Sequence, residues 1–124
     1  MTLRHQHSDV EVNVHGTRVV VQFPRWDSLN DHSIDCACQR LTEHGQHKHQ
    51  DEIVLDLSNV DYLTGAALGK LVTLDKDLRA NGATLVLLNP RPIVEESLAV
   101  TRLNTVFDVR TGSRALAYWE SLAG

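Results

Sequence analysis

The segment over residues 53–71 constrains the fold most, because it joins a buried strand to a helix through a short polar loop. Its first residues are apolar, include β-branched Ile53 and Val54, and are typical of a strand covered on both faces. The Asp-Leu-Ser-Asn turn at 56–59 ends this strand, and helical spacing begins at Thr64. The loop therefore opens at the carboxyl end of a parallel strand, where α/β domains place binding and regulatory groups. The predicted inward face of the helix comprises Ala67, Leu71, Leu74 and Leu78.

Strand and helix patterns alternate along the rest of the chain. Strands over 10–14 and 19–23, joined by a turn at 15–16, predict an antiparallel hairpin. Asp75 and Arg79 are four residues apart and predict a solvated pair on the outer face of the second helix. The other expected elements are a first helix from Asp27 or Ser28 to Gly45, a strand before Pro90, a third helix from Pro92 through about Leu103, a short strand over 106–109, and a final helix that Ser113 caps, with Leu116, Trp119 and Leu122 inward.

The order of these elements predicts one α/β domain over residues 1–124. We expect a mixed central sheet of about five strands flanked by four helices, with residues 1–8 as a flexible N-terminus. A length of 124 residues suits a single hydrophobic core, and no linker or repeat divides the chain.

The segment 53–71, together with 81–90, resembles the STAS family, whose name joins sulfate transporters and anti-sigma factor antagonists. A common pattern of that family is an apolar strand, Asp-Leu-Ser, a short link ending in Val, an apolar pair, Asp-Ser-Ser-Gly-Leu-Gly, and a long helix that ends in a glycine. The resemblance covers the chain from about Val10 to about Trp119. The residues that fall in register are Val60, Leu63, Leu68, Gly69 and Leu71, with Gly82 at the helix-ending glycine.

The chain departs from that pattern at the residues that carry the family's switch. Thr64 takes the aspartate position, Gly65 the position of the serine that partner kinases phosphorylate, Ala66 the second serine and Ala67 the glycine. A glycine cannot carry a phosphate. A serine-based switch at this position is therefore excluded by chemistry.

Charge and hydropathy exclude several other classes of function. The net charge of −4 provides no basic stripe for nucleic acid and disfavours anionic lipid. The sequence has no apolar run of membrane-spanning length and no charged-then-apolar leader, so we expect a cytoplasmic protein that does not bind membranes and is not by itself a transporter.

The start of the second helix superficially resembles a nucleotide-binding loop. That motif needs four residues between its glycines and a Ser or Thr after its lysine, whereas Gly65 and Gly69 are separated by three residues and a leucine follows Lys70. We therefore expect no nucleotide hydrolysis.

Histidine and cysteine residues suggest a metal site at first sight. His32 and Cys36 are four residues apart on the first helix, as two ligands on one helical face would be. A structural zinc site takes four protein ligands, and His44, His47 and His49 belong to a polar link. Cys36 and Cys38 point about 200° apart around a helix and cannot bridge to each other there. We expect no metal, no cofactor and no disulfide, and we interpret Cys38 as a core residue.

No pairing of a nucleophile with a base is recognisable either. We expect the side chains of Asp56 and Ser58 to point to opposite faces of the strand end, and no histidine has the context of a general base. The sequence therefore predicts a protein that is not an enzyme.

The loop itself is the predicted site. Thr64 is expected to cap the second helix, and a phosphate there would lie at a helix N-terminus that favours anions. The resemblance implies that an anti-sigma factor or a related kinase-like protein binds this surface and is released on phosphorylation. The alternatives are a small-ligand or anion sensor that uses the same helix start, or a subunit of a larger signalling assembly; we expect a monomer or weak dimer. The candidate partner-binding residues are Asp56, Ser58, Asp61, Thr64, Gly65, Ala66 and Gly69, with Thr64 as the possible phosphoacceptor.

Overall fold

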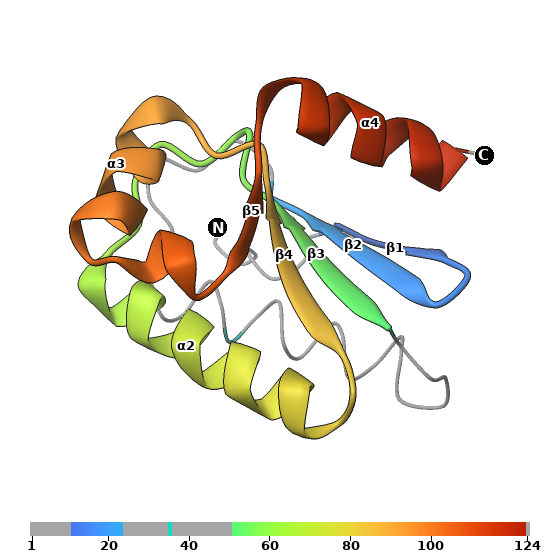
Figure 1. The fold of residues 1–124 in the computed structure, drawn as a ribbon, viewed down its shortest axis with the longest axis horizontal. Coiled ribbons are helices and arrows are strands. Elements are labelled where there is room, and N and C mark those ends of the chain that lie inside the picture. Colours follow the sequence, from blue (N-terminus) through green and yellow to red (C-terminus); the bar gives the residue numbers. More distant parts are fainter. Residues whose placement is uncertain (1–10, 24–34, 36–50, 124) are drawn as a thin grey trace, which may run out of the picture.

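The computed structural model of the protein describes residues 11–23, 35 and 51–123. These residues form a five-stranded sheet in the order β1-β2-β3-β4-β5 (Figure 1). The strands are β1 (Glu11–His15), β2 (Arg18–Gln22), β3 (Glu52–Asp56), β4 (Thr84–Leu88) and β5 (Asp108–Arg110).

The sheet is mixed, as the sequence predicts. β1 pairs with β2 in antiparallel orientation, and Gly16, at φ 67°, makes the left-handed turn between them. β2, β3, β4 and β5 are all parallel, so their carboxyl ends meet at one edge of the sheet. The predicted loop after β3 lies at that edge.

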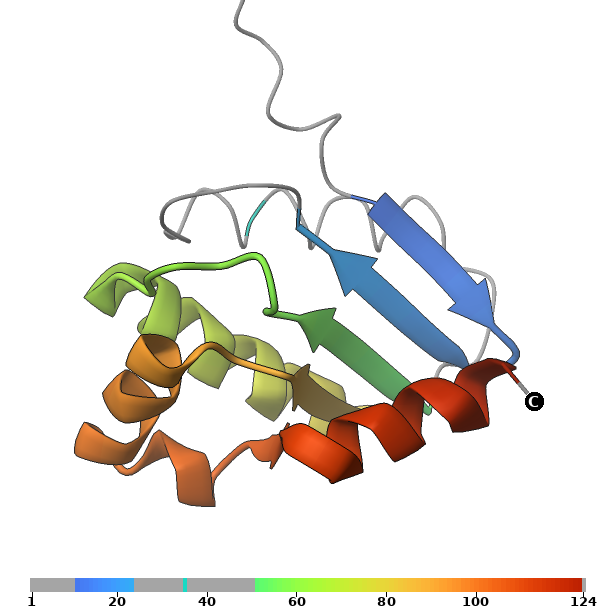
Figure 2. The same ribbon diagram turned by 90° about the horizontal axis from the view of Figure 1, so that it is seen from above.

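Helices cover both faces of the sheet in the described part of the chain. These helices are α2 (Gly65–Ala80), α3 (Pro92–Val100), the short 3₁₀ helix η2 (Leu103–Thr105) and α4 (Gly112–Ala123). α2 and α3 lie on one face, and α4 crosses the other from β5 toward the β1–β2 hairpin (Figures 1 and 2).

Alternation along the central strands divides the core between these two faces. Odd-numbered residues such as Ile53 and Leu55 pack with Ala67 and Leu71 of α2. Even-numbered residues such as Val54 pack under α4. The central strands β2, β3 and β4 are therefore buried on both faces, as their near-continuous apolar sequences require, whereas β5 at the edge of the sheet is only half-buried.

Several predicted helix boundaries need correction. The expected first helix lies outside the described residues except for Asp35, which is helical. α3 ends at Val100 and not near residue 103, because Arg102 adopts a left-handed conformation at φ 63° and the chain continues as η2. The last strand is β5, at Asp108–Arg110 and not over 106–109.

The predictions for the final helix were wrong in two respects. The helix begins at Gly112, so Ser113 lies inside it, and the carbonyl of Thr111 accepts hydrogen bonds from the N–H groups of Arg114 and Ala115. Leu116 is 61% exposed, not inward. Ala115 and Tyr118 are buried instead, with Trp119 and Leu122 packed beside them, which is the spacing of one helical face.

The predicted solvated pair on α2 is also wrong in part. Asp75 and Arg79 do form an ion pair, with 3.1 Å between Arg79 Nε and Asp75 Oδ2, but the Asp75 side chain is only 5% exposed. Asp75 lies on the inward face with Ala67 and Leu71. Leu74 and Leu78 pack partly buried against the same core, so the predicted helical face is correct.

Among the described helices, none combines the length and the apolar character that crossing a membrane requires.

Candidate functional site

The end of β3 is fixed by the buried carboxylate of Asp56. Its Oδ1 accepts hydrogen bonds from Ser58 N at 3.1 Å and Ser58 Oγ at 2.8 Å, and its Oδ2 accepts one from Gln22 Nε2 at 3.1 Å. The expectation that Asp56 and Ser58 point apart is therefore wrong, because they stand two residues apart and the chain turns between them. Asp56 is only 6% exposed and serves to shape the loop.

Arg91 holds the same loop from the side of α3. Its Nε donates to the carbonyl of Ser58 at 2.8 Å, and its NH1 group lies 3.1 Å from Asp61 Oδ1. Arg91 is the residue before the first turn of α3, placed there by the Asn-Pro-Arg-Pro sequence over 89–92. Asn59 Nδ2 donates to the carbonyl of Phe23, which links the loop to the end of β2 at 3.2 Å.

α2 begins at a side-chain cap, as predicted. Thr64 has an extended backbone (φ −75°, ψ 160°), and its Oγ1 accepts a hydrogen bond from Ala67 N at 3.1 Å. Its carbonyl accepts the first intrahelical bond, from Leu68 N at 3.0 Å. The first turn of α2 has no acidic residue, so the positive end of the helix dipole is not offset there.

The outward side of the helix start carries almost no side-chain volume. Gly65, Ala66 and Gly69 are exposed, and a Cβ built on Gly65 or Gly69 would meet no other atom within 4 Å. Lys70, the next residue, is paired with Asp35 at 3.2 Å. The result is an accessible backbone surface beside an open helix N-terminus.

Two large apolar side chains are exposed, one in the loop after β3 and one two residues beyond Arg91, and neither of them was singled out from the sequence. Tyr62, in the loop, is 48% exposed, and Ile93, at the start of α3, is 55% exposed. Neighbouring Val60 and Leu63 are buried and anchor the loop between them. Arg91 was missed as well; its position after a β4 strand end, next to the β3 loop, is the signal that could have identified it.

The structure thus places the predicted residues at one edge of the sheet. Some of them brace the loop from within, and the others lie on its surface. Asp56 and Ser58 lie inward and brace the loop, whereas Asp61, Gly65, Ala66 and Gly69 are exposed and Thr64 is half-buried at the cap. Within residues 11–23, 35 and 51–123, no three acidic, histidine or cysteine side chains come together as metal ligands. His32, Cys36, Cys38 and the histidines over 44–49 lie outside the described residues.

The same architecture occurs in several solved structures. A crystal structure of TM1081 from Thermotoga maritima, described as a candidate anti-sigma factor antagonist, is 23% identical, with a TM-score of 0.69 over 93% of this chain and 97% of that one. An NMR structure of TM1081 is 20% identical, with a TM-score of 0.73 over 99% of this chain and 94% of that one. The structure of the anti-sigma factor antagonist SpoIIAA in its unphosphorylated form is 15% identical, with a TM-score of 0.68 over 90% of this chain and 96% of that one.

These likenesses show the fold. The STAS domain model matches residues 11–115, which is most of the sequence and includes β1 through the first turn of α4. The loop after β3 and the capped start of α2 lie within this match. The chain therefore belongs to the STAS domain family.

Proposed function

We propose that the protein is a non-catalytic regulatory module that binds an anti-sigma factor or a related kinase-like protein through the start of α2. The observation that carries the proposal is the braced, exposed loop that leads into an unobstructed helix N-terminus. The likeness to anti-sigma factor antagonists supports it. Partner switching in the cytoplasm, with an effect on transcription, is the corresponding biological role.

The contact surface in this proposal consists of exposed groups on the loop and helix, together with the half-buried Thr64 at the cap. Asp61, Thr64, Gly65, Ala66 and Gly69 face the partner, and Gly65 and Gly69 let its backbone or side chains approach α2 closely. Tyr62 and Ile93 add apolar area at the edge, since exposed aromatic side chains commonly anchor protein interfaces. Asp56 and Ser58 act indirectly, by fixing the loop's shape.

Control of binding has two possible forms without a serine at position 65. The module is either constitutively competent for its partner or is regulated by a phosphate on Thr64. A phosphate there would lie beside unpaired N–H groups at the start of α2, which stabilise an anion, while its charge and volume would oppose the partner.

The open N-terminus of α2 also favours a second candidate, a sensor for a small anion. A ligand retained at this helix start through purification would support the sensor. A protein captured at the same surface would support partner switching.

Site-directed cross-linking tests the proposed surface. A photo-reactive residue at Gly69 is expected to cross-link to the anti-sigma factor or kinase-like protein in native lysate, because a side chain there enters open space. The matched control is the same residue at Leu116, which is 61% exposed on α4 at the opposite face of the sheet. Equal cross-linking from both positions, or capture from position 116 alone, would refute the assignment of the surface.

A further inference from the structure

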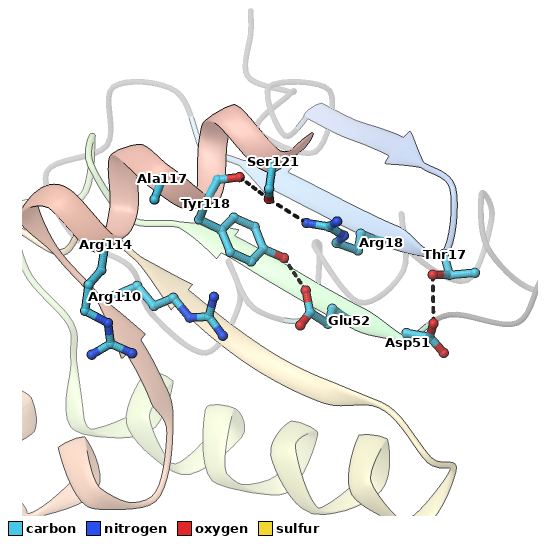
Figure 3. Close-up of a pocket in the computed structure, with 9 residues that line it drawn as sticks. All are labelled: Thr17, Arg18, Asp51, Glu52, Arg110, Arg114, Ala117, Tyr118 and Ser121. Atoms are coloured by element: carbon cyan, nitrogen blue, oxygen red, sulfur yellow. Dashed lines mark hydrogen bonds between the residues drawn. The ribbon is translucent and has the colours of Figure 1, made fainter. Parts of the chain in front are cut away.

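A polar hollow of about 640 Å³ lies beneath α4, on the face of the sheet opposite α2 (Figure 3). The first residues of β2 and β3, Arg18 and Glu52, form one wall, since both point to the α4 face. Arg110 from the end of β5 and Arg114 from α4 form the other end. The volume is typical of sites for small organic molecules. Nothing in the proposed function uses this hollow.

The two carboxylates in the hollow, Asp51 and Glu52, accept hydrogen bonds from uncharged hydroxyl groups. Asp51 Oδ2 accepts a hydrogen bond from Thr17 Oγ1 at 2.8 Å, and the carboxylate of Glu52 accepts one from the hydroxyl of Tyr118. Burial, together with this bond to Glu52, raises the pKa of Tyr118 to about 12, so the hydroxyl keeps its proton at neutral pH.

The arginines are less completely paired. Arg110 binds both oxygens of Asp108, at 3.1 and 2.8 Å. Arg18 donates to Ser121 Oγ at 2.9 Å but forms no ion pair with a carboxylate in the described part of the chain. The side chain of Arg114, an exposed residue, makes neither a hydrogen bond nor an ion pair among the described residues, although its charge helps to lower the pKa of Asp108. Two guanidinium groups therefore retain donors for a ligand.

The arrangement of these groups indicates the shape of the ligand. Ser121, the partner of Arg18, is seven residues beyond Arg114 on α4, which corresponds to about 10 Å along the helix. The guanidinium groups of Arg18 and Arg110 already lie over the ring of Tyr118, at 5.4 and 5.0 Å from its centroid. A ligand that needs an aromatic ring for stacking would have to displace them.

We propose that this hollow is a binding site for a small, polar organic anion. Arg114 holds its oxyanion, a phosphate ester or a carboxylate, because a guanidinium group matches either one with two parallel donors. The polar remainder extends past Tyr118 toward Arg18 and Ser121. The site is separate from the partner surface and does not depend on the proposed function.

Titration followed by amide NMR tests this site, with inorganic phosphate and acetate as separate probes at constant ionic strength. Saturable shifts are expected at Arg110, Arg114, Ala117 and Tyr118, the lining residues at the end of the hollow where Arg114 holds the oxyanion. A stronger response to phosphate identifies a phosphate ester as the ligand class, and a stronger response to acetate identifies a carboxylic acid. Both outcomes support an oxyanion site.

Substitution of Arg114, the arginine that holds the oxyanion in this proposal, provides a second test of the site. Arg114→Gln is expected to weaken binding of the better probe by about tenfold, the loss of one charge-assisted pair. The fold should persist, because the Arg114 side chain makes no hydrogen bond or ion pair within the described structure and the substitution leaves its backbone bond to Thr111 in place. Arg102→Gln, an exposed arginine between α3 and η2, is the matched control and should bind as the wild type does. No saturable shift with either probe, or equal affinity of Arg114→Gln and wild type, would overturn the proposal.

Discussion

Arg79 on the surface of α2 holds the buried carboxylate of Asp75 at 3.1 Å, although the two side chains are 59% and 5% exposed. The same guanidinium group donates through NH2 to the carbonyl of Val106 at 2.9 Å. Asp75 Oδ1 has no hydrogen-bond partner within the described structure. Arg79 therefore both compensates a buried charge and ties the segment before β5 to α2.

Arg79→Met should destabilise the fold by about 1–3 kcal/mol, because it leaves a buried carboxylate without its counter-ion. Asp75→Leu should be neutral or stabilising, since it replaces the buried charge with an apolar side chain on the core face of α2. Urea unfolding of both variants measures the difference. Equal losses of stability would show that the ion pair itself, and not the cost of burying Asp75, determines the effect.

The raised pKa of Tyr118 leads us to expect that the folding stability of the protein changes at alkaline pH. Its pKa is raised from 10.0 to about 12 by burial and by the hydrogen bond to Glu52, so the folded state favours the protonated phenol. The resulting stabilisation is complete below pH 10 and is lost as the pH rises from 10 toward 12. Tyr118→Phe should lack this part of the pH dependence.

Alkaline titration of tyrosinate absorbance gives an independent measurement. The chain has two tyrosines, so the late ionisation step should disappear in Tyr118→Phe and persist in Tyr62→Phe. Persistence of the late step without Tyr118 would contradict the assignment.

Gly69 lowers the stability of α2 without a packing reason. Its backbone is helical, and a Cβ would meet no atom within 4 Å, so Gly69→Ala should stabilise the protein by about 0.5–1 kcal/mol. Gly82→Ala is the control that should destabilise it, because φ there is +80°. Thermal unfolding of the two variants distinguishes them. Stabilisation accompanied by weaker partner binding would indicate that the glycine is kept for contact.

The inward face of α2 can be tested by two adjacent substitutions. Leu71 is fully buried between α2 and the sheet, and Leu71→Ala should cost about 2–5 kcal/mol. Lys70 is exposed and paired with exposed Asp35, so Lys70→Ala should change stability by at most about 0.5 kcal/mol. Similar unfolding midpoints for the two variants would mean that the helix is rotated.

The features that the sequence predicted well have strong local signals. The hairpin around Gly16 follows from alternation and a turn residue, and α2 follows from its apolar spacing and the Thr64 cap. Proline at the start of α3 likewise marks a helix boundary that the structure confirms at Pro92. Each of these signals lies within a few residues of the feature it specifies.

The features that were missed depend on contacts distant in sequence or on backbone angles without a residue signature. Asp75 is buried on the inward face of α2, and its counter-ion Arg79 bonds to the carbonyl of Val106, 27 residues further along the chain, which nothing within α2 reveals. The break after α3 occurs at Arg102, a residue with no preference for left-handed backbone. The contacts of Arg91 with the β3 loop span 33 residues between Arg91 and Ser58, so they become visible only once β3 and β4 are neighbours.

The last prediction concerns control at the start of α2. Thr64→Ala should lose about 1 kcal/mol of stability, because the N–H of Ala67 loses its acceptor. Thr64→Glu should lose less stability than Thr64→Ala, since a carboxylate is stabilised at a helix N-terminus. The added negative charge should nevertheless weaken partner binding. Intact-mass analysis of the protein from its native cells shows whether Thr64 carries phosphate.

Gly65→Ser tests whether the chain lacks only the hydroxyl that would accept a phosphate, or also the geometry that a kinase recognises. The new side chain meets no atom within 4 Å, so the variant should fold normally. Its phosphorylation by the kinase-like partner, with release of the complex, would show that the geometry for a switch is intact and only the hydroxyl is missing. If phosphate is found on another residue, or if Thr64→Glu folds and binds the partner as tightly as wild type, control through Thr64 is wrong. Unchanged binding in all variants, with no native phosphate, would instead indicate a constitutively competent module.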